Sequence, residues 1–187
     1  MRFIKTQLLV STIWIFLYIF NGAFNNIIFY SSYIAIIFLP AGFKITIACL
    51  LGTRVFFGLF IGALVTAYLF LTKDMLHHAP IFAFLSALSP VITILLVKKF
   101  VPLGKKLEKL NIYTVLLIAL FHAIINSFMH NTYLLLTDNI NLEKYQSDTL
   151  FMFIGDLLGS IIFLFLLSYN RRIIYKFASK YFMGNEE

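Results

Sequence analysis

Phe38-Leu39-Pro40-Ala41-Gly42-Phe43-Lys44 opens the stretch that decides the fold, residues 38–70. An apolar run follows to Gly52-Thr53-Arg54, and a second apolar run ends at Phe70. Proline removes a backbone donor and clashes with the preceding turn, and glycine loosens the chain after it. The pattern therefore predicts a membrane helix broken at Pro40–Gly42. In lipid such a break is tolerated only where the freed backbone groups face protein or a wet cavity, so it indicates a site.

The composition identifies the class of protein. Of the 187 residues, 61% are hydrophobic and only 12% are charged, which excludes an ordinary soluble domain. Repeated apolar runs of roughly 20 residues match a bilayer core of ~30 Å, whereas barrel strands would alternate in ~10-residue segments. The sequence thus predicts an all-α, polytopic integral membrane bundle.

The hydropathy pattern predicts about six transmembrane helices, the second of them broken at Pro40–Gly42. We expect an uncleaved first span, because Asn21-Gly22-Ala23-Phe24 lacks the small-x-small pattern of a signal-peptide cleavage site. Ser89-Pro90 predicts a milder kink in the fourth span. We expect one transmembrane domain over residues 1–187 and no soluble domain. The predicted spans cover residues 7–24, 28–51, 55–71, 80–97, 112–136 and 149–168.

Charge placement predicts the orientation. With both termini cytoplasmic, Arg2, Arg54, the five lysines of residues 98–109 and the basic residues of 171–180 all lie on the inner side. Topology and contact with anionic lipid account for the net charge of +7, so no nucleic-acid partner is predicted. The predicted partner is the lipid bilayer.

Polar side chains inside the predicted spans are the candidate ligand site. Asp156 lies well inside the sixth span, where a carboxylate costs ~2.5–3.5 kcal/mol unless it has a partner or faces water. His122, Asn126 and His130 recur every four residues and share one face of the fifth span. At ~1.5 Å per residue, Asn126, His130 and Asp156 fall in one layer of the outer half.

The break itself supplies the remaining candidates, Pro40, Ala41, Gly42 and Lys44. Lys44 is predicted nearer the inner end, roughly 12 Å from Asp156, and is expected to snorkel or to bind carbonyls at the break. Two interpretations stay open. The polar groups form an outward-facing pocket for a small ligand, or they only hold the helices together by hydrogen bonds.

No catalytic motif is present in the sequence, so no enzyme, cofactor or metal site is predicted. His77-His78 lacks the carboxylate or cysteine company of a metal site. Glycines at small-x-x-x-small spacing are predicted to let helices approach closely. These predicted packing residues are Gly58, Gly62, Gly155 and Gly159.

An ordered set of motifs resembles the first of the MASE families, the bacterial membrane-associated sensor domains. The motifs are Leu39-Pro40-Ala41-Gly42, Gly52-Thr53-Arg54, Phe57-Gly58, Gly62-Ala63 and Gly155-Asp156-Leu157-Leu158-Gly159. The chain departs from the family pattern where Leu39 replaces a tryptophan, where Phe57 and Phe165 replace prolines, and where Ala67 stands in place of a common asparagine. If those positions line the family's ligand site, this chain binds something else or nothing.

The resemblance implies a multi-pass sensor of the bacterial inner membrane. The family usually precedes a cytoplasmic cyclase, phosphodiesterase or kinase domain. We expect this chain to act without one, as a sensor module that binds an unknown small ligand and signals through a cytoplasmic partner. Two alternatives stay open. One is a small-molecule transporter or an energy-coupling-factor-like binding subunit that needs a transporter module, and the other is a ligand-free scaffold.

Overall fold

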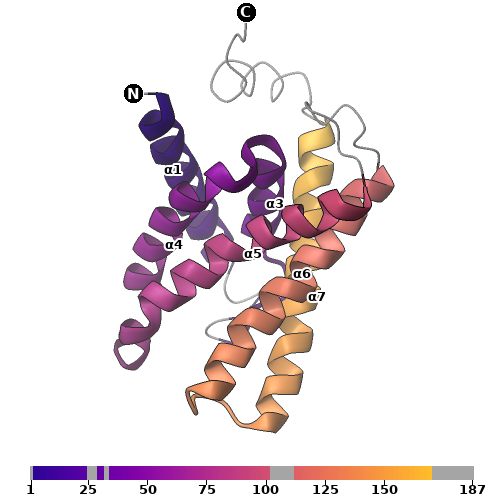
Figure 1. The fold of residues 1–187 in the computed structure, drawn as a ribbon. Coiled ribbons are helices and arrows are strands. Elements are labelled where there is room, and N and C mark those ends of the chain that lie inside the picture. Colours follow the sequence, from indigo (N-terminus) through magenta and orange to yellow (C-terminus); the bar gives the residue numbers. More distant parts are fainter. Residues whose placement is uncertain (1, 25–28, 32–33, 102–111, 170–187) are drawn as a thin grey trace, which may run out of the picture.

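A computed structural model describes residues 2–24, 29–31, 34–101 and 112–169 (Figure 1). Within these residues six α-helices form the bundle, and two short 3-10 helices and one two-stranded hairpin lie between them in the chain. The elements in chain order are α1 (Arg2–Gly22), β1 (Phe29–Ser31), β2 (Ile34–Ala35), α3 (Leu39–Leu51), η1 (Gly52–Val55), α4 (Phe56–Phe70), η2 (Lys73–His78), α5 (Ala79–Phe100), α6 (Ile112–Leu136) and α7 (Leu142–Tyr169).

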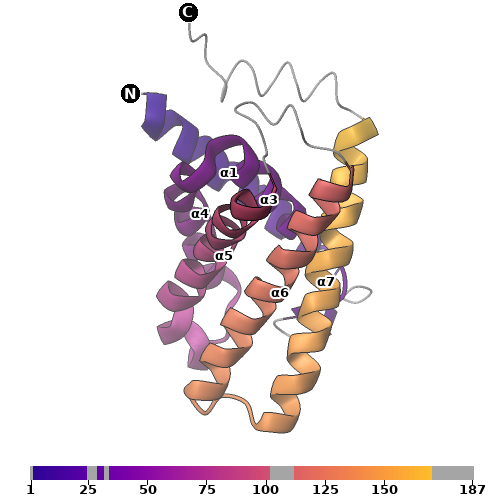
Figure 2. The same cartoon turned by 45° about the vertical axis from the view of Figure 1, so that its right-hand side comes forward.

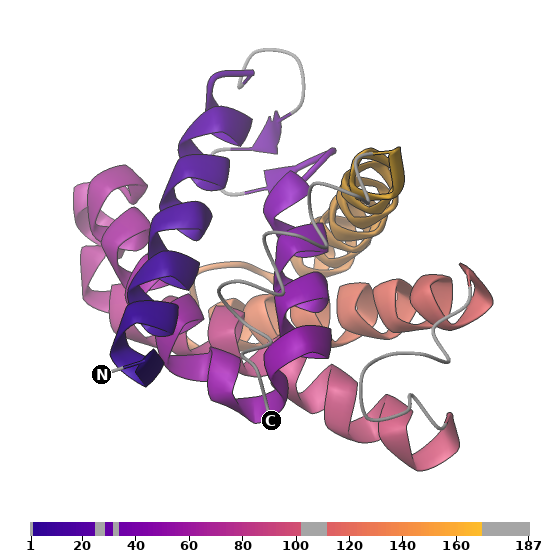
Figure 3. The same ribbon diagram turned by 90° about the horizontal axis from the view of Figure 1, so that it is seen from above.

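The helices pack as a chain of neighbours. α6 and α7 form a long antiparallel pair, seen side by side in Figures 1 and 2. Viewed from above, α3 (purple) lies between α1 (indigo) and α7 (yellow) (Figure 3). The start of α1 and the end of α7 lie at one end of the bundle, and the α6–α7 connection lies at the other (Figure 1).

The exterior of the bundle is apolar, as a lipid-facing surface requires. Phe16, Leu69 and Phe165 expose 66%, 62% and 69% of their surface, far more apolar exposure than a soluble protein tolerates. Five helical segments of the described chain are long and apolar enough to cross a membrane. The predicted all-α, polytopic membrane bundle is confirmed. These segments are Phe3–Gly22, Leu39–Phe70, Lys73–Phe100, Tyr113–Leu136 and Leu142–Leu167.

The predicted break inside a second helix is wrong. The described residues of 29–38 contain a two-stranded antiparallel hairpin and a bend, and α3 begins only at Leu39. Pro40 therefore lies in the first turn of a helix, where its missing N–H costs nothing. Asn21 of α1 caps this start, because its Oδ1 accepts a hydrogen bond of 3.0 Å from Leu39 N. Pro40–Gly42 thus starts a helix instead of breaking one.

The reversal between α3 and α4 occurs at Gly52. Its φ of 61° lies in the left-handed region, which glycine adopts without steric cost. α3 has 13 residues and α4 has 15, so each alone is shorter than a full membrane span. The 3-10 turn η1 connects the end of α3 to the start of α4.

Pro90, where the sequence predicts a kink in the fourth span, lies inside the continuous helix α5. A proline here cannot donate to the carbonyl of Ser86, one turn earlier. The Ser89 hydroxyl lies 3.4 Å from that carbonyl oxygen, while its single proton is donated over a shorter distance, 2.7 Å, to Asn126 Oδ1 of α6.

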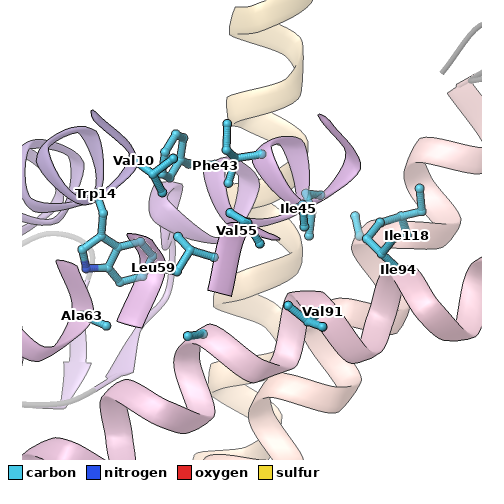
Figure 4. Packing of buried hydrophobic residues seen from close by; sticks show 14 of the residues in the cluster. Val10, Trp14, Phe43, Ile45, Val55, Leu59, Ala63, Val91, Ile94 and Ile118 are labelled. Atoms are coloured by element: carbon cyan, nitrogen blue, oxygen red, sulfur yellow. The ribbon is translucent and has the colours of Figure 1, made fainter. Parts of the chain in front are cut away.

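The apolar core joins α1, α3, α4, α5 and α6. Figure 4 shows Val10 and Trp14 of α1 close to Leu59 of α4, and Ile94 of α5 against Ile118 of α6. All five are at least 98% buried. The core lies toward the end of the bundle where α1 starts, so the opposite half is left for polar groups.

Close helix approaches occur at the four predicted packing glycines. A Cβ added to Gly58 would come within 2.8 Å of Val10, and one added to Gly62 within 2.8 Å of Trp14. A Cβ on Gly155 or Gly159 would clash with the backbone carbonyl of Ala35 or Phe38. Gly58 and Gly62 therefore let α1 pack closely on α4. Gly155 and Gly159 let the segment before α3 pack closely on α7.

Two further boundaries differ from the prediction. α7 begins at Leu142, so the polar link expected over 137–148 is shorter, and Asp148 lies within the helix. Within the basic loop, residues 102–109 lie outside the described part, as does the basic tail at 171–180.

Candidate ligand-binding site

A cavity of about 370 Å³ lies among the helices of the bundle. It extends from Lys44 and Asp156 to Asn139 and Lys144, which lie at the α6–α7 connection. Its walls combine aromatic rings, aliphatic side chains, amides and charged groups. The aromatic and polar residues of the lining include Trp14, Phe38, Lys44, Thr66, Phe82, Ser86, Asn126, His130, Asn131, Asp148 and Asp156.

A buried polar network forms the inner end of the cavity. Asn126 Oδ1 accepts a hydrogen bond of 3.1 Å from Lys44 Nζ, and its Nδ2 donates one of 2.7 Å to Asp156 Oδ2. Each of the three side chains is only 1% exposed. The Asn126 amide thus bridges a buried cation and a buried anion. Both charges favour the orientation in which the amide oxygen faces Lys44 and the amide nitrogen faces Asp156. Isolated charges would be very costly at this depth, so the network neutralises the inner end.

The position of Lys44 corrects the expectation that it snorkels toward the inner surface. α3 begins at Leu39, which places Lys44 in the second turn of a short helix wedged between α1 and α7. Its ammonium reaches Asn126 of α6, and it also lies 3.5 Å from the Ser86 hydroxyl of α5. The lysine therefore joins three helices in the same layer as Asp156.

Aromatic rings complete the surroundings of the ammonium. Lys44 Nζ lies 5.6 Å from the Trp14 ring and 5.9 Å from the Phe38 ring, within the range of cation–π attraction. Trp14 is held in place by a hydrogen bond of 3.2 Å from its Nε1 to the Thr66 hydroxyl. These rings give the cavity an apolar wall beside its charged end.

The two predicted histidines take different places. His130 lines the cavity, stacks on Phe82 and lies 3.0 Å from the backbone oxygen of Asn126. His122 is fully buried, does not line the cavity, and approaches Ser89 at 3.4 Å. Ser89 in turn donates a hydrogen bond of 2.7 Å to Asn126 Oδ1. His122 therefore contacts the network through Ser89 and lies outside the cavity lining.

Two of the motifs singled out in the sequence meet in space. Phe38 N donates a hydrogen bond of 3.0 Å to the Gly155 carbonyl of α7, and Gly42 faces the Phe163 side chain. Because Gly155 and Gly159 have no side chains, residues 35–38 can lie directly on α7. This close contact sets the start of α3 beside Asp156, which lies between the two glycines. The Gly-Asp-x-x-Gly motif of α7 and the Pro-Ala-Gly motif of α3 thus lie in contact with each other at the inner end of the cavity.

The end of the cavity away from the buried polar network lies at the α6–α7 connection and is called its outer end because it is farther from that network. Asp148 of α7 is 4% exposed and lines the cavity together with Asn139 and Lys144. His78 lies nearby, hydrogen-bonded to Tyr133 and, at 3.2 Å, to Asn139. The His77 ring packs against His78 with the two ring planes tilted by 43°. Within the described ranges no group of three His, Cys, Asp or Glu side chains could hold a metal ion.

Only some of the ligand-site residues predicted from the sequence line the cavity. Lys44, Asn126, His130 and Asp156 line the cavity, whereas Pro40, Ala41 and Gly42 are buried where α3 starts and do not line it. Trp14, Phe38, Ser86 and Asp148 also line the cavity and were not among the residues predicted from the sequence. Asp148 carried a usable signal, because it lies eight residues before Asp156 and so close to the same face of a continued helix. The aromatic residues carried none, since many phenylalanines are spread through every span.

An apolar helical exterior around a cavity with a buried polar network defines a polytopic integral membrane protein. Comparison with known families identifies it further: the MASE1 family model matches residues 7–180, nearly the whole chain, and the chain belongs to this family of membrane-associated sensor domains. The resemblance found in the motifs is confirmed. No curated protein and no solved structure matches the chain. A sensor domain is not a catalytic family, in keeping with the absence of enzyme motifs from the sequence.

Proposed function

We propose that this membrane sensor domain binds a small organic ligand in the cavity and passes the binding event to a cytoplasmic output protein. The observation that carries the proposal is the Lys44–Asn126–Asp156 network at the base of a cavity of about 370 Å³. That volume falls in the range of small-molecule sites, ~300–1,000 Å³, which typically combine apolar walls with a few converging polar groups.

The ligand acts by favouring one packing of the helices over another. A ligand shifts such an equilibrium only if it binds the two states with different affinity. α7 provides the connection, because Asp148, Met152 and Asp156 line the cavity while the helix continues to Tyr169 at the other end of the bundle. A ligand held by these residues changes the position of the end of α7, where the output protein detects it.

The proposal includes the orientation of the bundle in the membrane. With the start of α1 and the end of α7 in the cytoplasm, the cavity opens toward the outer side of the inner membrane of a bacterium. The basic side chains Lys98 and Lys99 at the end of α5 then lie on the cytoplasmic side, as positively charged flanks favour. The ligand reaches the site from outside the cell.

Occupancy tests the proposal. The protein is purified in lipid nanodiscs after exposure to a small-molecule extract of its source cells, and native mass spectrometry detects any bound molecule. Ala67→Phe fills the cavity, because Ala67 lines it, whereas Val65→Phe adds the same ring to a 39% exposed, outward position of α4. We expect wild type and V65F to carry the molecule and A67F to lose it. Equal occupancy in A67F and V65F would contradict a ligand site in this cavity.

The transporter alternative gives a different result with the molecule so identified. A transporter or transport subunit would accumulate it inside proteoliposomes, alone or with its ATPase module. A sensor binds it without accumulation and, after cross-linking in cells, yields a complex with a kinase or cyclase-type protein. A ligand-free scaffold gives neither result.

A further inference from the structure

A second buried carboxylate lies in the outer part of the cavity. Asp148, Met152 and Asp156 are spaced four residues apart on α7, and all three line the cavity. At ~1.5 Å per residue the two aspartates are about 12 Å apart along the helix. Both are almost fully buried, with 4% and 1% of their surface exposed. The cavity therefore has two acidic positions, one near each end.

The two carboxylates differ in how they are satisfied. Asp156 accepts the hydrogen bond from Asn126 and lies near the Lys44 ammonium. Asp148 Oδ1 is buried and has no hydrogen-bond partner among the described residues. Lys144, one turn earlier, acts on Asp148 electrostatically, but the described part of the chain contains no hydrogen bond between them. A buried carboxylate oxygen left without a donor is costly, so the site favours a ligand that brings one.

The charged side chains at the two ends of the cavity determine where a cationic group of a ligand would bind. Lys44 holds a positive charge at the inner end and disfavours a second cation there, whereas Asp148 attracts one at the outer end. Trp14, Phe38 and Phe82 line the cavity and suit an apolar body. Resting on the proposed function, we infer that the ligand is a small organic amine whose ammonium group donates to Asp148 while its apolar body enters the aromatic part of the cavity.

The test uses the protein's single tryptophan, since Trp14 lines the cavity and its fluorescence reports what enters. The full chain in nanodiscs is titrated with 2-phenylethylamine and with 2-phenylethanol, a neutral molecule of nearly the same shape. A charge-assisted hydrogen bond is worth roughly tenfold or more in affinity, so we expect the amine to bind at least about tenfold more tightly.

Three variants separate the contributions. Asp148→Asn should weaken amine binding to the level of the alcohol and leave alcohol binding unchanged. Glu143→Gln, which removes an exposed carboxylate five residues before Asp148 that does not line the cavity, should keep the amine preference. Lys144→Gln is an exposed substitution that removes the competing cation, and it should strengthen the preference. It also keeps the test decisive if D148N folds poorly.

The outcomes distinguish this inference from the proposed function. Saturable Trp14 responses with equal affinity for amine and alcohol, or an amine preference that survives D148N, would overturn the amine assignment and leave the cavity as a ligand site. An amine preference unchanged by K144Q would also count against it. No saturable response to either probe, together with equal native occupancy of A67F and V65F, would overturn the proposed function itself.

Discussion

At the scale of single residues, the fold depends on how two buried charges are kept together. Lys44 and Asp156 come from different helices, and Asn126 hydrogen-bonds to both. Removing one member of a buried ion pair is strongly destabilising because the other charge stays buried, whereas removing both costs much less. The network is therefore energetically a unit.

A double-mutant cycle measures this unit. Lys44→Met and Asp156→Leu should each lower the free energy of unfolding by about 3–5 kcal/mol, because each leaves an uncompensated buried charge. The double variant should lose clearly less than the sum, with a coupling of about 1–3 kcal/mol in denaturant titrations of the protein in mixed micelles. The exposed residues Lys73 and Asp74 serve as control, and their Met and Leu variants should be additive. Additive losses at Lys44 and Asp156 would show that the two charges do not support each other.

Sequence reasoning located part of this network and missed part of it. Asp156 and Asn126 could be placed in one layer because their helices are regular, so residue counting gives depth. Lys44 could not be placed, since its depth depends on where α3 begins, and the residues before Pro40 are as apolar as a membrane helix. Asp148 was assigned to a link because the polar residues 137–148 conceal the start of α7 at Leu142.

At the scale of the elements, the decisive feature is the start of α3 on α7. The hairpin residues of 29–35 replace the first half of the predicted second span, and Asn21 of α1 caps the helix that follows. A proline followed by a glycine is compatible with either a break or a helix start. Only the tertiary partner, the side chain of Asn21, distinguishes the two.

Pro40→Ala tests this helix start. A proline in the first turn gives up no hydrogen bond, so its replacement should change stability by less than about 1 kcal/mol and should not raise the helix content measured by circular dichroism. Asn21→Ala, which removes the cap, should cost more, about 0.5–2 kcal/mol. A clear gain of helix in P40A would mean that proline interrupts a longer helix.

Gly155→Ala tests the contact between α7 and the segment before α3. The added Cβ would meet the Ala35 carbonyl, a backbone atom that cannot move aside alone. We expect a loss of about 3 kcal/mol or more, or failure to fold, because overpacking forces the backbone apart. Leu158→Ala on the same helix is the control, since Leu158 is 39% exposed on the outer face. A G155A protein as stable as L158A would contradict the close approach.

For the molecule as a whole, the proposed entry of the ligand from outside the cell depends on which end of the bundle faces outward. In a background with Cys49→Ser, a cysteine at the exposed position Asp138 lies at the α6–α7 connection, and one at Lys5 lies at the start of α1. A membrane-impermeant maleimide should label the cysteine at Asp138 in right-side-out vesicles, and the one at Lys5 only after the membrane is opened. The reverse pattern would place the cavity mouth in the cytoplasm.

Asp156→Asn tests most directly whether the buried network serves a ligand or only joins helices. The substitution keeps the shape of the side chain and removes its charge, so a large part of the protein should still fold. Native mass spectrometry of that folded fraction in nanodiscs should show the co-purifying molecule lost or reduced at least about tenfold relative to wild type, as expected when a charge-assisted contact is removed. A lower folded yield with undiminished occupancy would show instead that Asp156 only holds the helices together.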